Sequence, residues 1–259
     1  MKTQDWNSGP RERSVEIPDG SRRVRGTLSL AAEPGAVVVF AHGSSSSGRS
    51  SPRSQLVTRE LLNAGLATLL VDLLEEDEAQ ERRKVHDVEL LADRLSAAIH
   101  WLSRDPETRG LRLGFFGAGT GAAATLVAAA QLPKSVGAVV SRGGRLDLAN
   151  NALPDVVAPT LLIVGGRDEA VLELNRQALQ LLRCPSDLIV LPGATHPFPE
   201  PGALEEVVRL AGRWFLRHLA AAPRSSRRRP GKAPVATEEM LGEPSPRPDG
   251  TCNHETQAH

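Results

Sequence analysis

The stretch at residues 111–121, LRLGFFGAGTG, decides the fold. It begins with an apolar run of strand length, Leu111 to Phe116, and ends in the turn Gly117-Ala-Gly-Thr-Gly121. The almost wholly apolar segment Ala122 to Ala130 follows directly. Apolar runs on both sides of a glycine-rich turn predict a buried strand, a tight turn and a buried helix.

The same alternation of strand-like and helix-like segments continues outward from this stretch. Further apolar runs of strand length lie at residues 36–40, 67–71, 136–140, 160–164 and 187–191, and residues 15–30 indicate two strands joined by turn residues 18–21. Apolar residues recur at helical spacing over 88–102 and 204–215, and shorter helices are expected at 56–62 and 171–182. The sequence therefore predicts an α/β domain with a mostly parallel, doubly wound sheet flanked by helices.

The composition indicates how the chain is divided. We expect a flexible N-terminus at 1–11, one domain at 12–220 and a disordered Pro/Arg-rich tail at 221–259, which has almost no large apolar residue to offset its ordering entropy. Arg227-Arg-Arg229 could attract an acidic partner, although a solubilising tail is the simpler interpretation. No large lid domain is expected, and the charged stretch Glu75 to Asp87 is expected to be a solvated loop or helix face.

Charge and composition argue against several classes of partner. The chain has 31 basic and 31 acidic residues, so its zero net charge gives no overall attraction to nucleic acid or to a membrane surface. No apolar run approaches the roughly 20 residues of a membrane span. Only Cys184 and Cys252 occur, and neither has metal-like spacing, so we expect no disulfide framework and a cytoplasmic location. The oligomeric state is not readable from the sequence.

Two further predicted strands end in polar residues. Gly165-Gly-Arg-Asp168 follows the strand at 160–164, where an Asp is placed to orient a histidine or to cap the next helix, a role that Glu169 could share. His196 follows the strand at 187–191, and a histidine in a loop is more often only a polar loop residue. Because ligands bind at the carboxyl ends of parallel strands, we expect Asp168 and His196 to lie near the glycine turn.

The glycine turn, Asp168 and His196 follow the order of nucleophile elbow, acid and base that is typical of α/β-hydrolases. In that interpretation Gly117–Gly121 has the outline of a Gly-x-Ser-x-Gly elbow with Gly119 at the central position. The alternative is a plain glycine-rich turn that a phosphate could approach. The loop after the strand at 36–40 would supply one oxyanion-hole N–H at Ser44, with Gly43 as the neighbouring option, and Thr120 would supply the other.

The sequence resembles the dienelactone-hydrolase-like branch of the α/β-hydrolases over about residues 12–220. The segments that carry the resemblance are 38–44 (VVFAHGS), 117–123 (GAGTGAA), 159–168 (PTLLIVGGRD) and 192–196 (PGATH). It implies hydrolysis of small ester or lactone bonds, with His196 as general base, Asp168 as its orienter, and the N–H groups of Ser44 and Thr120 as the oxyanion hole. It also implies a serine at position 119; the dienelactone enzymes themselves use a cysteine, and this chain has glycine there.

Gly119 removes the hydroxyl that would attack the substrate, and three substitutes remain open. Thr120 is adjacent, but its side chain should point away from His196. Ser44 to Ser47 carry hydroxyls that nothing in the sequence positions. A water activated by His196 would leave weak hydrolysis. We therefore carry two hypotheses: a small-ester hydrolase whose activity is impaired or lost, and a non-catalytic protein that binds a ligand or partner through the same site.

The remaining polar candidates carry less weight. Asp72 ends the strand at 67–71 and could line the site, although a cap or turn role explains it equally well. Arg142 or Arg145 could meet an anionic substrate, but turn chemistry alone explains the glycines between them. We expect no metal, because His, Cys and carboxylate residues are not clustered at ligand spacing. We expect no nucleotide cofactor, because the glycine turn lacks the Lys of a P-loop.

Overall fold

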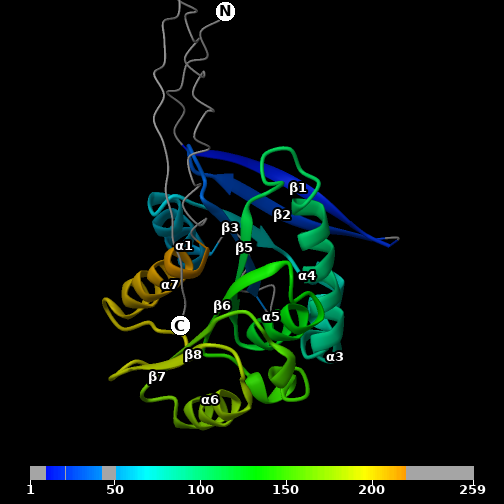
Figure 1. The fold of residues 1–259 in the computed structure, drawn as a ribbon. Coiled ribbons are helices and arrows are strands. Elements are labelled where there is room, and N and C mark those ends of the chain that lie inside the picture. The colour runs from blue at the N-terminus through cyan, green and yellow to red at the C-terminus, as the bar shows by residue number, and fades with distance from the viewer. Residues whose placement is uncertain (1–9, 21, 43–50, 220–259) are drawn as a thin grey trace, which may run out of the picture. The chain divides into compact units, whose positions relative to one another are not determined.

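The computed structural model describes residues 10–20, 22–42 and 51–219. Its eight strands form one sheet with the order β1-β2-β4-β3-β5-β6-β7-β8 (Figure 1). The strands are β1 (Arg11–Asp19), β2 (Arg22–Leu30), β3 (Ala36–His42), β4 (Leu66–Val71), β5 (Arg112–Ala118), β6 (Val136–Arg142), β7 (Thr160–Gly165) and β8 (Ser186–Leu191). The β1–β2 hairpin joins β4 in antiparallel fashion, and the pairs from β4 to β8 are all parallel. The predicted mostly parallel α/β class is confirmed.

Helices cover both faces of the sheet, as Figure 1 shows with α1 and α7 on the left and α4 and α5 on the right. The helices are α1 (Pro52–Asn63), α2 (Glu76–Gln80), α3 (Arg82–Val85), α4 (Val88–Leu102), α5 (Thr120–Gln131), α6 (Glu169–Leu181) and α7 (Ala203–Leu219). Two short 3-10 helices, η2 (Leu146–Ala149) and η3 (Leu153–Asp155), connect β6 to β7. None of the helices in the described part of the chain is long and apolar enough to cross a membrane.

The central strands are buried because each of their faces packs against a separate apolar cluster. In β3, Val37 and Val39 belong to the cluster that includes α4 and α5, while Val38 and Phe40 belong to the cluster that includes α1 and α7. Successive side chains of a strand point to opposite faces, so a strand covered on both sides must be apolar at every position. This is why the apolar runs in the sequence predicted these strands correctly.

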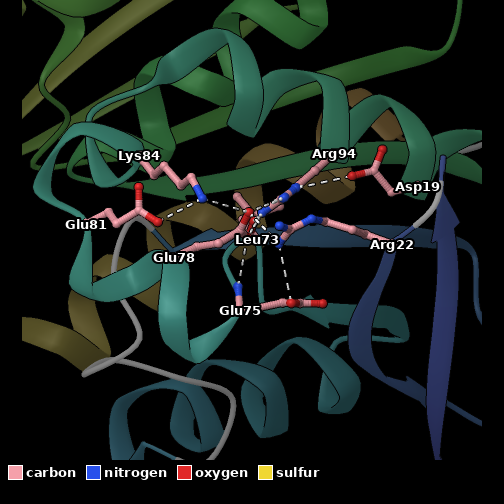
Figure 2. A network of polar contacts seen from close by, with 8 residues as sticks. All are labelled: Asp19, Arg22, Leu73, Glu75, Glu78, Glu81, Lys84 and Arg94. Carbon is pink, nitrogen blue, oxygen red and sulfur yellow. Dashed lines mark hydrogen bonds and ion pairs between the residues drawn. The ribbon is translucent and has the colours of Figure 1, made fainter.

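In the charged stretch between β4 and α4, Glu78 differs from the prediction of a solvated loop or helix face, while the other side chains of residues 75–87 are exposed or partly exposed. The stretch forms α2 and α3, and Glu78 of α2 is only 2% exposed. Figure 2 shows the reason: both Glu78 oxygens accept hydrogen bonds from the Arg94 guanidinium of α4, at 2.6 and 2.9 Å. The prediction was wrong for Glu78, because a carboxylate can be buried when a bidentate arginine partner is buried with it.

The same network, centred on Glu78 of α2, ties three further parts of the chain together. Arg94 also donates to the Leu73 carbonyl at 2.5 Å and to Asp19 at 3.2 Å, and Arg22 donates to Glu78 at 2.8 Å (Figure 2). Asp19 and Arg22 face each other in the β1–β2 hairpin, and Leu73 follows β4. The network therefore attaches the hairpin and the segment after β4 to α4.

Candidate active site

The loops that carry the predicted site residues meet at the carboxyl edge of the parallel strands. The ends of neighbouring strands lie close in register: Ala118 and Arg142, the last residues of β5 and β6, pair with each other, and Arg142 pairs with Ile163, two residues before the end of β7. Gly165 of β7 pairs with Leu191 of β8. The residues that follow these strands therefore start from one edge of the sheet, where open α/β sheets bind their ligands.

The turn after β5 has a backbone that only particular residues can adopt. Gly119 has φ 56° and ψ −126°, and it is the N-cap of α5. A β-carbon at Gly117 would lie 2.5 Å from Cα of Ala122, so position 117 requires glycine. Among the described residues beyond its chain neighbours, no heavy atom lies within 4 Å of a β-carbon placed at Gly119. A short side chain at 119 would thus meet none of these residues, at a conformational cost that glycine does not have.

The N-terminus of α5 opens at this turn without a cap. Gly119 offers no capping side chain, and the first turn contains no acidic residue. Within the described part of the chain, no acceptor bonds the backbone N–H of Thr120, the first residue of this 12-residue helix. Unpaired N–H groups and the helix dipole make such an end attractive to an anion or a developing oxyanion.

Asp168 and His196 contact each other directly. Nδ1 of His196 lies 2.8 Å from Oδ2 of Asp168, and the His196 side chain is 52% exposed. An ionised carboxylate can only accept, so the proton of this bond is on Nδ1, and Nε2 is the ring nitrogen that Asp168 does not engage. Asp168 also caps α6, because its Oδ1 accepts from the N–H of Val171 at 3.4 Å. The two roles considered for Asp168 thus occur in one carboxylate.

The loop after β6 joins the glycine turn to His196. Arg145 donates its backbone N–H to the Gly119 carbonyl at 3.0 Å. At Gly143, where φ is +54°, a β-carbon would lie 3.2 Å from both Cε1 and Nδ1 of His196. The imidazole therefore packs closely over Gly143. From the sequence, this loop was predicted only to contact an anionic substrate through Arg142 or Arg145. Its bond to Gly119 could not be predicted, because a backbone hydrogen bond does not depend on the type of residue.

The His196 loop is held by a carboxylate that the sequence reasoning missed. Oε1 of Glu200 accepts hydrogen bonds from the Thr195 hydroxyl at 2.7 Å and from the Thr195 N–H at 3.0 Å. The hydroxyl bond lowers the pKa of Glu200, with smaller contributions from backbone N–H groups and the charge of Arg167. The feature of the sequence that could have indicated this contact is a glutamate four residues after His196 in a proline-rich loop.

The two arginines singled out after β6 differ in their environment. Arg145 pairs with Asp147 through two bonds of 2.8 and 2.9 Å, and this pairing raises its pKa. Arg142 has no acidic partner among the described residues, and its guanidinium carbon lies 6.0 Å from the centroid of the Phe198 ring. Burial, together with the like charge of Arg53, lowers the pKa of Arg142 to about 10.

Other predicted residues lie at the edge of this arrangement or beyond it. Ser44 and its option Gly43 lie outside the described residues, so the first oxyanion donor stays a prediction. Asp72 follows β4, and its N–H donates to the Arg25 carbonyl at 2.9 Å. In the part of the chain that the structure describes, no three His, Cys, Asp or Glu side chains gather as possible metal ligands.

Comparisons with known proteins agree with this architecture. A dienelactone hydrolase from Anabaena variabilis shares 48% identity, with a TM-score of 0.78 over 82% of this chain and all of that one. The protein Est1E from Butyrivibrio proteoclasticus, at 15% identity and a TM-score of 0.68 over 80% of this chain and 99% of its own, shows the same fold. An esterase domain from Rhodothermus marinus, at 19% identity, has a TM-score of 0.66 over 81% of this chain and 99% of its own.

Curated relatives come from two strains of Mycobacterium tuberculosis and are named "Putative phosphoribosyl transferase". They are 53% identical over 209 residues, which is 81% of this chain and 47% of the relative. The chain thus spans about half the length of these relatives. The model of the dienelactone hydrolase family matches residues 26–215, which include the glycine turn, Asp168 and His196. The chain belongs to the dienelactone hydrolase family.

Proposed function

We propose that this site is built for the hydrolysis of small carboxylic esters or lactones and that Gly119 leaves its activity impaired or lost. In this proposal the turn at 117–121 is the nucleophile elbow of the family, His196 is the general base, and Asp168 orients it. The N–H of Thr120 is one donor of the oxyanion hole, and Ser44 supplies the other. The observation that carries the proposal is the space above Gly119, which the described residues leave open around a β-carbon, at the start of the uncapped N-terminus of α5.

The geometry supports these roles in chemical terms. A general base needs an imidazole nitrogen that can take a proton, and the bond from Nδ1 of His196 to Asp168 makes Nε2 the nitrogen available for that step. An oxyanion hole needs donors that are already fixed in place, and the first N–H of a helix meets this need. The step that lacks a group is nucleophilic attack, since Gly119 has no hydroxyl to deprotonate.

Among the substitutes for the hydroxyl, a water activated by His196 is the one we favour. Thr120 is already the first residue of α5, so its N–H rather than its side chain serves the site. A water in the open space above Gly119 would need only the base and the oxyanion donors. Loss of one triad member can leave roughly 10³–10⁴-fold catalysis over water, so the expected activity is weak.

The deciding experiment is a four-way assay with short-chain nitrophenyl esters. It compares the protein as it stands, Gly119→Ser, Gly119→Ala and Gly119→Ser combined with His196→Ala. We expect Gly119→Ser to raise kcat/KM greatly, because only the nucleophile is missing. Gly119→Ala is the matched control: it adds the same β-carbon without the hydroxyl and should not gain activity. The double variant should lose the gain.

A Gly119→Ser protein that folds normally and stays inert toward a broad panel of esters and lactones would overturn the proposal. That result would favour the second candidate function, in which the protein is non-catalytic and binds a ligand or partner at this site. The space above Gly119 also favours that candidate, because no described residue beyond its chain neighbours comes within 4 Å of a β-carbon placed there. Saturable ligand binding without turnover would support it.

The name of the mycobacterial relatives, a putative phosphoribosyl transferase, describes a different activity from the ester hydrolysis proposed for this chain. Those proteins are about twice as long as the matched segment, which covers 47% of their length. The matched half is the part that corresponds to the dienelactone hydrolase family. We therefore propose that the transferase name describes the other half of those relatives and not the domain present in this chain. Assaying this chain for phosphoribosyl transfer should give no activity.

A further inference from the structure

Asn175 of α6 is a buried polar residue that none of the roles above uses. The buried face of this helix consists of Val171, Leu172, Asn175 and Ala178, and Asn175 is 0% exposed. An amide in the interior costs free energy unless its polar atoms find hydrogen-bond partners. The partners of Asn175 therefore indicate why this position holds an amide and not an apolar side chain.

Both hydrogens of the Asn175 amide nitrogen are bonded. Nδ2 donates to the Gly144 carbonyl at 2.9 Å and to the Val171 carbonyl at 2.8 Å. The Val171 bond stays within α6, whereas the Gly144 bond reaches the loop between β6 and η2. Oδ1 of Asn175 is buried and accepts no hydrogen bond among the described residues, which lowers stability. The bond to Gly144 is thus the contact that the amide provides to the rest of the fold.

The backbone at Gly144 packs too closely for any side chain. A β-carbon there would lie 2.3 Å from Oγ of Ser141 and 2.9 Å from Cβ of Ala122. Ser141 belongs to β6, and Ala122 belongs to the first turn of α5. Residue 144 is therefore packed against the sheet and α5, and Asn175 ties its carbonyl to α6.

The two neighbours of Gly144 contact the two parts of the site that the proposed chemistry needs together. Gly143 lies against the His196 imidazole, whose Cε1 and Nδ1 would be 3.2 Å from a β-carbon at that position. The N–H of Arg145 donates to the Gly119 carbonyl at 3.0 Å. A segment of three residues thus connects the proposed base to the glycine turn, and its middle residue is the one bonded to α6.

Helix α6 consequently reaches the site at two points. Its N-cap is Asp168, whose Oδ2 lies 2.8 Å from Nδ1 of His196. About two turns further along the helix, Asn175 holds Gly144, which follows the residue that packs against the same imidazole. A single helix therefore fixes the imidazole through Asp168 and through Gly143.

We propose that Asn175 is a positioning residue, which sets the distance between the His196 imidazole and residue 119 by fixing the Gly144 carbonyl. The inference rests on the proposed function for the identity of the base and of the nucleophile position. In the described part of the chain Asn175 bonds neither of these groups, so it acts through residues 143–145. A displacement of about 1 Å far from the chemistry can cost roughly 100-fold in rate, and the amide prevents such a displacement.

The first test needs no turnover and follows hydrogen exchange by NMR in the full chain. In native protein labelled with ¹³C and ¹⁵N, the two Nδ2 hydrogens of Asn175 should exchange slowly with solvent, because both are buried and bonded. Rapid exchange of these hydrogens would overturn the proposal, whether or not any variant folds.

Two variants then remove the amide in different ways. Asn175→Leu keeps the branched shape of the side chain, and Asn175→Ala cannot overpack the site. In both, the Arg145 N–H should exchange about 10-fold faster or more, because the loop that presents it has lost a hydrogen bond. The Cε1–H resonance of His196 should shift as well, since the loop packs against this ring. A native value for either signal in both variants would overturn the proposal.

Leu172→Ala is the matched control for a loss of stability. Leu172 lies on the same buried face of α6 and packs in a small apolar cluster with Val164 and Val171. This variant should lower the unfolding temperature and leave the Arg145 exchange and the His196 resonance as they are in the native chain. If Asn175 had only a structural role, its variants would behave in the same way as Leu172→Ala, and that result would overturn the proposal.

The second test uses the active Gly119→Ser background that the proposed function predicts. Adding Asn175→Leu or Asn175→Ala should lower kcat about 10- to 100-fold and change KM by less than about twofold, because the distance between base and nucleophile matters to the reaction step and not to substrate binding. Adding Leu172→Ala should change neither constant. A raised KM with an unchanged kcat in the Asn175 variants would overturn the positioning role.

The failure of this inference can be told apart from the failure of the proposed function. An active Gly119→Ser protein whose kcat is unaffected by both Asn175 substitutions would overturn the role of Asn175 alone. An inert Gly119→Ser protein would overturn the hydrolase proposal alone, because the exchange of the Asn175 amide and of the Arg145 N–H still decides whether Asn175 fixes the loop.

Discussion

Asp168 holds His196 with one carboxylate oxygen and the start of α6 with the other. Oδ2 lies 2.8 Å from Nδ1 of His196, and Oδ1 accepts from the Val171 N–H at 3.4 Å. The orientation of the proposed base is therefore coupled to the first turn of a helix that packs against β7 and β8. A single residue carries both a stabilising contact and a contact for the proposed chemistry, and the two can be separated by substitution.

Asp168→Asn should remove the chemical role and keep the structural one. Asn caps a helix as well as Asp, so the free energy of unfolding should change by no more than about 0.5 kcal/mol. The amide cannot hold the imidazole in the same proton state, so kcat in a Gly119→Ser background should fall by about 10⁴. Asp168→Ala should lose both the orientation of His196 and the cap of α6, and its free energy of unfolding should fall by about 1 kcal/mol more than that of Asp168→Asn. Urea unfolding and ester assays measure the two effects, and an Asn variant that keeps full activity would contradict the assigned role.

Gly143→Ala should disturb His196 more than it disturbs the fold. Its β-carbon would lie 3.2 Å from Cε1 and Nδ1 of the imidazole, in addition to the strain of a positive φ. Gly65→Ala is the matched control, since Gly65 has φ +78° and no heavy atom within 4 Å of a β-carbon. Both variants should lose about 1 kcal/mol of stability. Only Gly143→Ala should lower the activity of the Gly119→Ser protein; equal activity in both would show that the ring has room to move.

Substitutions in the glycine turn should separate backbone strain from steric overlap. Gly119→Ala should cost about 1–2 kcal/mol, because φ is +56° and the surrounding space is open. Gly117→Ala should cost more than about 3 kcal/mol or prevent folding, since its β-carbon would lie 2.5 Å from Cα of Ala122 in backbone that cannot move aside easily. Thermal and urea unfolding of the two variants measures which one loses more stability. The reverse order would mean that α5 can shift away from β5.

The sequence predicted the strands well because the central parallel strands are mostly apolar on both faces, as in β4 and β7, where every residue is buried. It placed Gly119, Asp168 and His196 on three loops at one sheet edge by the order of strands alone. It could not predict that Arg145 bonds the Gly119 carbonyl or that Gly143 lies against the imidazole, because backbone contacts and close packing leave no mark on residue type. The cytoplasmic location and the tail at 221–259 stay predictions.

The prediction that Glu78 lies in a solvated segment was wrong, because its side chain is buried. A charged stretch normally lies in water, and helical spacing alone does not reveal that Glu78 and Arg94 face each other. Their burial depends on four segments that meet only in the fold: the β1–β2 hairpin, the residues after β4, α2 and α4. Phe198 is a similar case, because its positive φ follows from the loop around Thr195 and not from any local preference of phenylalanine.

Breaking the Glu78–Arg94 pair should destabilise the protein strongly. Glu78→Gln leaves the buried Arg94 with Asp19 as its one acidic partner among the described residues, and Arg94→Gln leaves the buried Glu78 with Arg22 and Lys84. Either change should cost up to about 3–5 kcal/mol. The double variant Glu78→Leu/Arg94→Met should cost less than either single change, although it leaves the Leu73 carbonyl without its donor. Urea unfolding of the native chain, the two single variants and the double variant measures these differences in stability. Single variants that cost under 1 kcal/mol would show that water reaches the pair.

The same pair should make stability depend on acid. The hydrogen bond from Arg94, opposed by burial, lowers the pKa of Glu78 from 4.5 to about 2. A carboxylate whose pKa is depressed in the folded state stabilises the protein above its unfolded pKa, and this contribution is lost as the pH falls from about 4.5 toward 2. A depression of this size corresponds to about 3 kcal/mol. The Glu78→Leu/Arg94→Met protein serves as the control for all other carboxylates. Between pH 6 and pH 3, the native chain should lose more unfolding free energy than the double variant, and parallel curves would show that Glu78 does not titrate abnormally.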